Sequence, residues 1–310
     1  MKFKPIVVVA GEPNSIFFEI FFKSLKSKNY NSGLILICNK KKLDKEIKKF
    51  NFKKNIELLN IYKIDPKNIK KNKIYIIDVK KQNPNNYVLD CFDVAFKLIK
   101  SGFTNKLING PVDKSKTLKK KYLGITEYIS KKFNKKKFAM LIYNEKLSVC
   151  PITTHLPLKL VTKEISQKTI KEKVNIVDEF YKNFLKFKPR IAVVGLNPHC
   201  ESIHNFNEDQ KILLPAIKSL KKRININGPF PADTLFLKKN RKNYDVIIGM
   251  YHDQVLTPIK TMFEYDAINI TVGLPFLRVT PDHGPNEKMI GKNSSSPISL
   301  IRSLEFLDKK

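Results

Sequence analysis

The sequence lacks the features on which disulfide-stabilised and membrane-spanning proteins depend. Its four cysteines lie far apart and form no C-x-x-C pair, which argues against a disulfide framework and against a zinc ribbon. No stretch approaches the roughly 18 uninterrupted apolar residues that a membrane-spanning helix needs. The short apolar run near the N-terminus ends at Gly11, too soon for a signal peptide. We therefore expect a soluble protein of the reducing cytoplasm with no membrane partner.

The sequence also has neither of the two glycine-rich motifs that bind nucleotide phosphates. The dinucleotide-binding fingerprint G-x-G-x-x-G and the P-loop G-x-x-x-x-G-K-[ST] are both absent. The segment 11–20, GEPNSIFFEI, has the position of a phosphate-binding turn after a first strand, but it contains a single glycine. Residues that would contact a nucleotide therefore stay unidentified at this stage.

Acidic residues are scarce in comparison with basic ones. The 310 residues include 59 Lys or Arg and 28 Asp or Glu, which gives a formal net charge of +31. Such a charge can indicate nucleic-acid binding, but the lysines are spread along the whole chain and no RNA-binding aromatic motif or zinc-finger spacing occurs. We expect no specific nucleic-acid partner, and we expect the charge to attract small anionic substrates.

Hydrophobic residues make up 42% of the chain, and their pattern is typical of an α/β protein. Short β-branched apolar runs alternate with longer segments in which apolar residues are three and four positions apart. Strands are predicted at 5–10, 33–38, 74–79, 106–109, 138–143, 147–152, 190–196, 245–250 and 267–272. Helices are predicted at 14–27, 87–101, 163–186, 208–222 and 297–307. The Lys- and Asn-rich segment 39–73 is interpreted as a tolerant surface region.

Four of the five histidines stand at or just after predicted strand ends, beside turn residues. They are His155, His199, His252 and His283. Such strand ends are where open α/β sheets place their ligands, and three imidazoles can bind one divalent ion. Widely separated histidines have no local metal signature, however, so structural or surface histidines remain the alternative.

Several whole segments resemble, in the same order, the 4-hydroxythreonine-4-phosphate dehydrogenase family of pyridoxal phosphate biosynthesis. They are NGPVDK (109–114), GITEY (124–128), TTHLPL (153–158), RIAVVGLNPHCE (190–201), GPFPADTLF (228–236) and YDVIIGMYHDQVLTPIK with INITVGLPFLR and DHG (244–284). The segments span most of the chain and are densest after residue 150.

The resemblance implies a fold like that of isocitrate and isopropylmalate dehydrogenases, with two α/β/α domains and an active-site cleft between them. It also implies a homodimer with the active site at the subunit interface. We expect the first domain to comprise residues 1–120 plus about 285–310, and the second to comprise residues 121–284.

The family's site residues carry over onto matching positions of this sequence. The implied metal ligands are His155, His199 and His252, two from one subunit and one from the partner. The implied substrate-binding residues are Thr126, Lys260, Asn269 and Arg278. Asp233 and Asp253 match acidic positions near the metal, and these two and Lys260 are the candidates for the catalytic base. The sequence does not decide among them.

The reaction implied by the resemblance is the oxidation of 4-phosphohydroxy-L-threonine with NAD or NADP, followed by loss of CO2 to give 3-amino-2-oxopropyl phosphate. One divalent metal ion per site, such as zinc, magnesium or cobalt, serves both steps as a Lewis acid. Lys260 and Arg278 supply cations for the substrate's phosphate and carboxylate.

The sequence departs from the family pattern at several positions. Ile125 replaces a histidine that contacts substrate phosphate, and isoleucine has no hydrogen-bond donor. Ser15 and Phe17 replace glycines of the first loop, and Pro285 follows DHG in place of threonine. Cys200, beside a predicted ligand, is interpreted as an apolar filler or a reactive thiol.

These departures leave alternatives open. A related dehydrogenase of a sugar-acid phosphate, 4-phospho-threonate or 4-phospho-erythronate, would keep the metal, the coenzyme and the decarboxylation. A non-catalytic polyanion-binding protein or an inactive homologue would have lost metal histidines, and all three are present.

Overall fold

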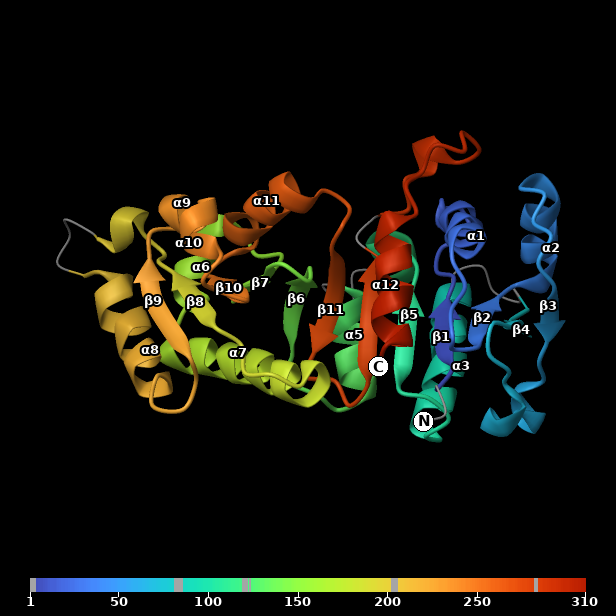
Figure 1. Ribbon diagram of the computed structural model, residues 1–310, viewed down its shortest axis with the longest axis horizontal. Coiled ribbons are helices and arrows are strands. Elements are labelled where there is room, and N and C mark those ends of the chain that lie inside the picture. The colour runs from blue at the N-terminus through green and yellow to red at the C-terminus, as the bar shows by residue number, and fades with distance from the viewer. Residues whose placement is uncertain (1–3, 81–85, 119–121, 123, 202–205, 282–283) are drawn as a thin grey trace. The chain divides into compact units, whose positions relative to one another are not determined.

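The computed structural model (Figure 1) describes residues 4–310 apart from 81–85, 119–121, 123, 202–205 and 282–283. The DHG motif with His283 therefore lies largely outside the described residues. The chain divides into two compact units, Met1–Lys132 with Leu274–Lys310 and Phe133–Gly273. None of the helices in the described part of the chain combines the length and apolar character that crossing a membrane requires.

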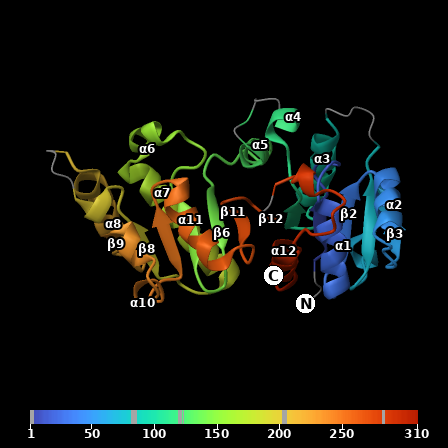
Figure 2. The ribbon, with the colours of Figure 1, turned by 90° about the horizontal axis from the view of Figure 1, so that it is seen from above.

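Unit 1 is built on a parallel sheet with the strand order β3-β4-β2-β1-β5-β12. Its strands are β1 (Ile6–Val9), β2 (Leu34–Cys38), β3 (Ile56–Leu58), β4 (Ile74–Asp78), β5 (Lys106–Asn109) and β12 (Leu277–Pro281). Its helices are α1 (Phe17–Ser27), α2 (Lys40–Lys49), α3 (Tyr87–Lys100), α4 (Lys114–Leu118), α5 (Ile125–Lys132) and α12 (Ile298–Asp308), with short 3-10 turns at Ile61–Lys63, Pro66–Asn68 and Glu287–Met289. Helices α1 and α12 cover one face of the sheet and α3 covers the other (Figure 2).

Unit 2 has the strand order β11-β6-β7-β10-β8-β9. Its strands are β6 (Ala139–Tyr143), β7 (Ser148–Pro151), β8 (Ile191–Val194), β9 (Ile226–Phe230), β10 (Val246–Gly249) and β11 (Ile268–Val272). Its helices are α6 (Leu158–Glu164), α7 (Gln167–Phe180), α8 (Leu214–Leu220), α9 (Ala232–Leu235), α10 (Lys238–Arg241) and α11 (His252–Phe263), with a 3-10 turn at Pro198–Cys200 and π-helical turns at Tyr181–Leu185 and Asp209–Leu213. Strands β7, β10, β8 and β9 run parallel, whereas β6 pairs antiparallel with β7 and with β11.

The nine strands predicted from apolar runs are all present. The central ones are buried along their whole length, as in β1 and β2, because a parallel sheet is covered on both faces. The helix predicted over 163–186 is present as α7 and the π-helical turn that follows it, but it begins at Gln167 because Ser166 and Thr169 form a capping box there. The interpretation of 39–73 as a surface region missed α2 and β3, because Leu43 is the single buried residue of α2 and no apolar stripe marks the helix.

The division into units differs from the boundaries expected at 120/121 and about 284/285. Helix α5 belongs to unit 1 because Tyr128 packs on two aromatic rings of α3, with centroids 6.5 Å from that of Phe92 and 6.2 Å from that of Phe96. Strand β12 belongs to unit 1 because it pairs in parallel with β5. The motif with Thr126 therefore lies in unit 1 together with Arg278.

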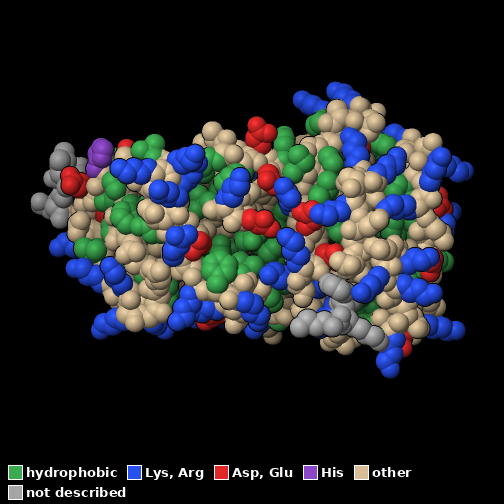
Figure 3. Space-filling model, in the orientation of Figure 1, with side chains coloured by type: hydrophobic (Ala, Val, Ile, Leu, Met, Phe, Trp, Pro, Cys, Tyr) green, Lys and Arg blue, Asp and Glu red, His purple; other side chains and the backbone are tan. Residues whose placement is uncertain are grey.

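Basic side chains are scattered over the face of the molecule that Figure 3 shows, with acidic and apolar side chains between them. No stripe of Lys and Arg dominates this view, which agrees with the distribution of lysines along the sequence.

Candidate active site

Three neighbouring strands of unit 2 each lead into a loop that carries one of the predicted metal-binding histidines. Strands β7, β10 and β8 are adjacent and parallel, so their carboxyl ends lie at the same edge of the sheet. His155 follows β7, His199 follows β8, and His252 begins α11 shortly after β10. The topology therefore places the three loops at the edge where α/β sheets bind ligands.

Two of these histidines meet within one chain. The ring centroids of His155 and His252 are 5.8 Å apart, with an angle of 35° between the ring planes. A metal–nitrogen distance of about 2.1 Å allows two imidazoles on one ion to have centroids about 5–6 Å apart. Among the described residues, no group of three His, Cys, Asp or Glu side chains is close enough to hold a metal ion. One chain therefore brings two of the three predicted ligands together, and His199 does not complete the set.

The orientation of His252 is determined by its neighbour. Its Nδ1 lies 2.7 Å from Oδ1 of Asp253, and the Asp253 side chain is otherwise 82% exposed. A carboxylate on one ring nitrogen makes the other nitrogen a better metal ligand, an arrangement common around metal-bound histidines. The geometry thus gives Asp253 the role of orienting His252, and the imidazoles fit a divalent ion.

The backbone at the predicted ligands adopts an uncommon conformation. His155 has a φ of 47° and His199 a φ of 56°, and Cys200 follows with a φ of 59°. Residues other than glycine adopt such left-handed angles rarely, and they keep them where the surrounding structure holds them in place. Backbone of this kind occurs at functional sites and also in ordinary turns, and eight non-glycine residues of the described chain besides these two histidines adopt it.

Cys200 fills space beside the loop that carries His199. It is buried, and a Cβ built on Gly195 would lie 2.6 Å from its Sγ. Burial raises the pKa of the Cys200 thiol to about 11, and the carboxylates of Asp209, Glu201 and Asp233 add to the increase. The thiol is therefore protonated at neutral pH, which favours the role of an apolar filler over that of a reactive thiol. The electrostatic effect of Asp233 shows that this predicted acidic residue lies near the same loop.

Unit 1 brings together two of the predicted substrate-binding residues. Arg278 lies on β12 and is 2% exposed. Its Nη1 donates a hydrogen bond of 2.8 Å to Oγ1 of Thr126, and its Nε donates one of 2.8 Å to Oδ1 of Asn109. Burial lowers the pKa of Arg278 to about 10, and the nearby Glu127 carboxylate partly opposes this effect. Arg278 thus stays a cation at neutral pH, with its planar guanidinium held by two neutral partners.

Asn109 is a residue of this site that the sequence analysis did not single out. It is 1% exposed at the end of β5, and its Oδ1 also accepts a hydrogen bond of 3.2 Å from Oγ1 of Thr280. The next residue, Gly110, packs so tightly that an added Cβ would lie 2.2 Å from the Ala10 carbonyl oxygen. The loops after β1 and β5 are therefore in direct backbone contact. The NGPVDK motif contained both residues, but nothing in it indicated that Asn109 would hold an arginine.

Lys260 and Asn269 lie on different elements of unit 2. Lys260 is on α11, two turns after His252, and burial lowers the pKa of its ammonium group. Asn269 is on β11, and its Oδ1 is buried without a hydrogen-bond partner among the described residues. An unsatisfied buried amide oxygen is unusual and is consistent with an acceptor reserved for a ligand.

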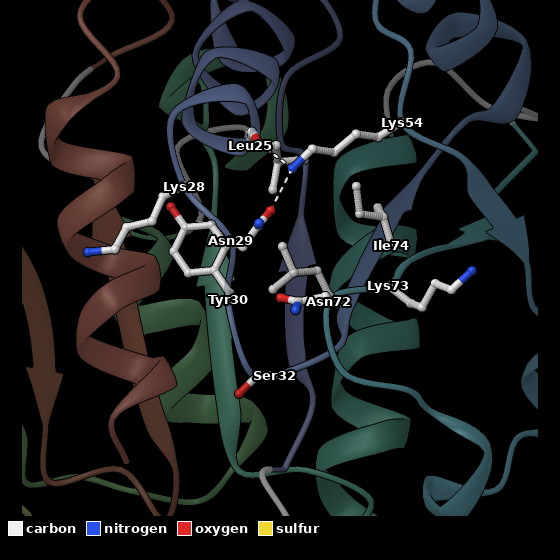
Figure 4. A pocket seen from close by; sticks show the side chains of 10 residues that line it. Leu25, Lys28, Asn29, Tyr30, Ser32, Lys54, Asn72, Lys73 and Ile74 are labelled. Carbon is white, nitrogen blue, oxygen red and sulfur yellow. Dashed lines mark hydrogen bonds between the residues drawn. The ribbon is translucent and has the colours of Figure 1, made fainter.

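Two hollows of unit 1 lie apart from the predicted site. The one shown in Figure 4 lies beside the amino ends of β2 and β4 and has a volume of about 20 Å³, room for a water molecule but not for a substrate. Lys54 crosses it to donate a hydrogen bond of 3.0 Å to Asn29, and the buried Ser32 hydroxyl in its wall has no partner among the described residues. The other hollow, about 470 Å³, opens beside Tyr62 and Lys97. Neither contains a predicted site residue.

Comparisons with known proteins show which family the chain is similar to. A family model described as pyridoxal phosphate biosynthetic protein PdxA matches residues 30–307. A 4-hydroxythreonine-4-phosphate dehydrogenase from Sulfurihydrogenibium sp. (strain YO3AOP1) is 35% identical over 97% of this chain and 96% of its own length. A D-threonate 4-phosphate dehydrogenase from Salmonella typhimurium is 31% identical over 92% of each chain.

The fold is shared with a solved structure of the same kind. The crystal structure of a 4-hydroxythreonine-4-phosphate dehydrogenase from Klebsiella pneumoniae matches with a TM-score of 0.82 and 28% sequence identity, and it covers 98% of both chains. The expected fold class, an α/β fold of the isocitrate dehydrogenase type, is thereby confirmed.

Proposed function

Since the chain belongs to the family of the pyridoxal phosphate biosynthetic protein PdxA, we propose that it is the dehydrogenase that oxidises and decarboxylates 4-phosphohydroxy-L-threonine with NAD or NADP in pyridoxal 5'-phosphate biosynthesis. The observation that carries this proposal is the pair of histidines His155 and His252, whose ring centroids lie 5.8 Å apart, with the Asp253 carboxylate 2.7 Å from Nδ1 of His252. The product would be 3-amino-2-oxopropyl phosphate.

His155 and His252 of one subunit and His199 of a second copy would hold a divalent ion such as zinc, magnesium or cobalt. When bound, the ion supplies a Lewis acid and NAD or NADP supplies the hydride acceptor. Asp253 engages Nδ1 of His252, which leaves Nε2 as the nitrogen that would bind the ion. This arrangement requires a homodimer with the active site at the subunit interface.

The residues that the resemblance implies for substrate binding would offer two cationic groups to the substrate's anions. Arg278 and Thr126 form one anion site: because the Thr126 oxygen accepts from Arg278, its hydroxyl proton is available to donate to phosphate. This pair supplies the contact that Ile125 cannot make. Lys260 supplies a second cation, and Asn269 supplies the buried amide oxygen that has no partner among the described residues.

The base that takes the hydroxyl proton is Lys260 or Asp233 in this proposal. Burial lowers the pKa of Lys260 and so raises the fraction of its neutral amine at a given pH. Asp253 is the weaker candidate because its carboxylate is already engaged by His252. The four cysteines are unpaired and buried, which fits the expected location in the reducing cytoplasm.

A second candidate substrate is D-threonate 4-phosphate. The Salmonella typhimurium relative named for that substrate is 31% identical over 92% of this chain, and Ile125 departs from the family histidine. The two substrates differ at C2, where one bears an amino group and the other a hydroxyl.

Reduction of NAD and NADP by the purified protein tests the proposal. Each coenzyme is offered with 4-phosphohydroxy-L-threonine, D-threonate 4-phosphate or 4-phospho-erythronate, before and after chelation and with each divalent metal restored. Metal-dependent turnover of 4-phosphohydroxy-L-threonine supports the proposal. Turnover confined to a sugar-acid phosphate would favour the second candidate substrate over the first. Absence of turnover with every substrate would contradict both candidate activities.

A further inference from the structure

The three histidine-bearing loops of unit 2 are tied to one another by hydrogen bonds that involve none of the histidines. Gln254 lies two residues after His252, on the first turn of α11. Its Oε1 accepts a hydrogen bond of 2.7 Å from the backbone N–H of Met250, and its Nε2 donates one of 2.7 Å to the carbonyl oxygen of Gly195. Both ends of one carboxamide thus join the loop after β10 to the loop after β8.

The Met250 backbone is also held from the other side. Its carbonyl oxygen accepts a hydrogen bond of 2.8 Å from Oγ1 of Thr153 and one of 3.2 Å from the Thr153 backbone N–H. Thr153 is buried and stands two residues before His155. The loop after β7 is therefore tied to the backbone of the same residue, Met250, that Gln254 binds.

The loop after β8, which carries His199, is also bound by a fully buried carboxylate. Asp209 is 0% exposed and accepts hydrogen bonds of 2.7 Å from the backbone N–H of Leu196 and 3.0 Å from that of Asn197. These two residues directly follow Gly195, to which Gln254 is bound. The loop of His199 is thus held at its start from both sides.

We infer that Gln254 is a positioning residue of the metal site, because it sets the left-handed loop of His199 and the start of α11 in a fixed relation. The inference rests on the proposed function, in which these histidines bind a metal ion. Left-handed backbone at His155 and His199 persists only where contacts hold it. Gln254 makes the hydrogen bonds that connect the loop after β10 to the loop after β8. Groups that orient metal ligands typically change metal affinity about 10- to 100-fold when they are removed.

Two substitutions separate the contacts of Gln254. Gln254→Met has a similar length and loses both hydrogen bonds. Gln254→Glu keeps an acceptor for the Met250 N–H but places a carboxylate oxygen against the Gly195 carbonyl oxygen, so it breaks only the link to the His199 loop. Gln167→Met is the matched control, because Gln167 is exposed on α7 and outside these loops.

The experiment titrates Co2+ into metal-stripped full-length protein and follows its visible absorption, with thermal unfolding as the check on folding. Wild type and Gln167→Met are expected to bind Co2+ with the same spectrum. Gln254→Met and Gln254→Glu are expected to bind at least about tenfold more weakly, with spectra shifted toward that of His199→Ala. If Gln254→Met does not fold, the Co2+ affinity and spectrum of Gln254→Glu test the inference.

Wild-type affinity and spectrum in both folded Gln254 variants would overturn the inference while leaving the proposed metal site intact. Absence of an imidazole-bound Co2+ spectrum in the wild type would overturn the metal site itself, and the inference with it. The two failures are therefore distinguishable without measuring turnover.

Discussion

Mixing two inactive variants tests whether the metal site is shared between subunits. One chain brings His155 and His252 to a centroid distance of 5.8 Å, and no third His, Cys, Asp or Glu joins them among the described residues. If His199 comes from the second copy, His199→Ala and His252→Ala each abolish activity in both sites of their own homodimers. A mixed dimer of the two has one site with all three histidines and one site that lacks two.

The expected recovery follows from counting dimers. Random reassociation of equal amounts gives about half mixed dimers, each with one complete site of two, so activity should return to about one quarter of that of the wild type. The assay is NAD(P)H formation after the subunits are exchanged, with differently tagged chains showing that mixed dimers form.

A mixture of His155→Ala with His252→Ala is the matched control. These two ligands come from the same chain in the proposed arrangement, so no mixed dimer has a complete site and no activity should return. Recovery in this control, or none from His199→Ala with His252→Ala when mixed dimers are present, would refute the reasoning.

Three further substitutions test other parts of the structure. Arg278→Lys should lower kcat/KM for the phosphorylated substrate about 10- to 100-fold, because an ammonium group cannot reproduce the planar fork that contacts Thr126. Gly110→Ala should lower the free energy of unfolding in urea by about 2 kcal/mol or more, because its Cβ would lie 2.2 Å from the Ala10 oxygen. If Lys260 acts as a cation, kcat/KM is full below its lowered pKa and falls as the pH rises through it; if Lys260 is the base, kcat/KM rises instead.

Each of these predictions has a matched control. Gly284→Ala should change stability little, because no atom lies within 4 Å of a Cβ built there; a similar loss at both glycines would contradict the packing argument. Lys260→Arg keeps the charge and should move the alkaline fall of kcat/KM to higher pH. An unchanged kcat/KM in Arg278→Lys would argue against anion binding by this residue.

Parts of the site could be predicted from local sequence, and parts could not. Periodicity located every central strand, because parallel strands buried on both faces consist of continuous apolar residues. It missed β3 and β9, which have few buried residues, and β12, in which the buried Arg278 interrupts the apolar run. The site residues were predicted from the resemblance of six segments, because spacing alone favoured structural or surface histidines over metal ligands.

The sequence by itself determined most of the strands, the turns that follow them and the chemical groups that those turns carry, because each depends on neighbouring residues. Only the tertiary structure decided that β7, β10 and β8 lie side by side, that Gln254 and Thr153 join their loops, and that Arg278 is buried between Asn109 and Thr126. These contacts join residues up to 169 positions apart. No local pattern records them, because the strand order of the folded sheet determines which side chains meet.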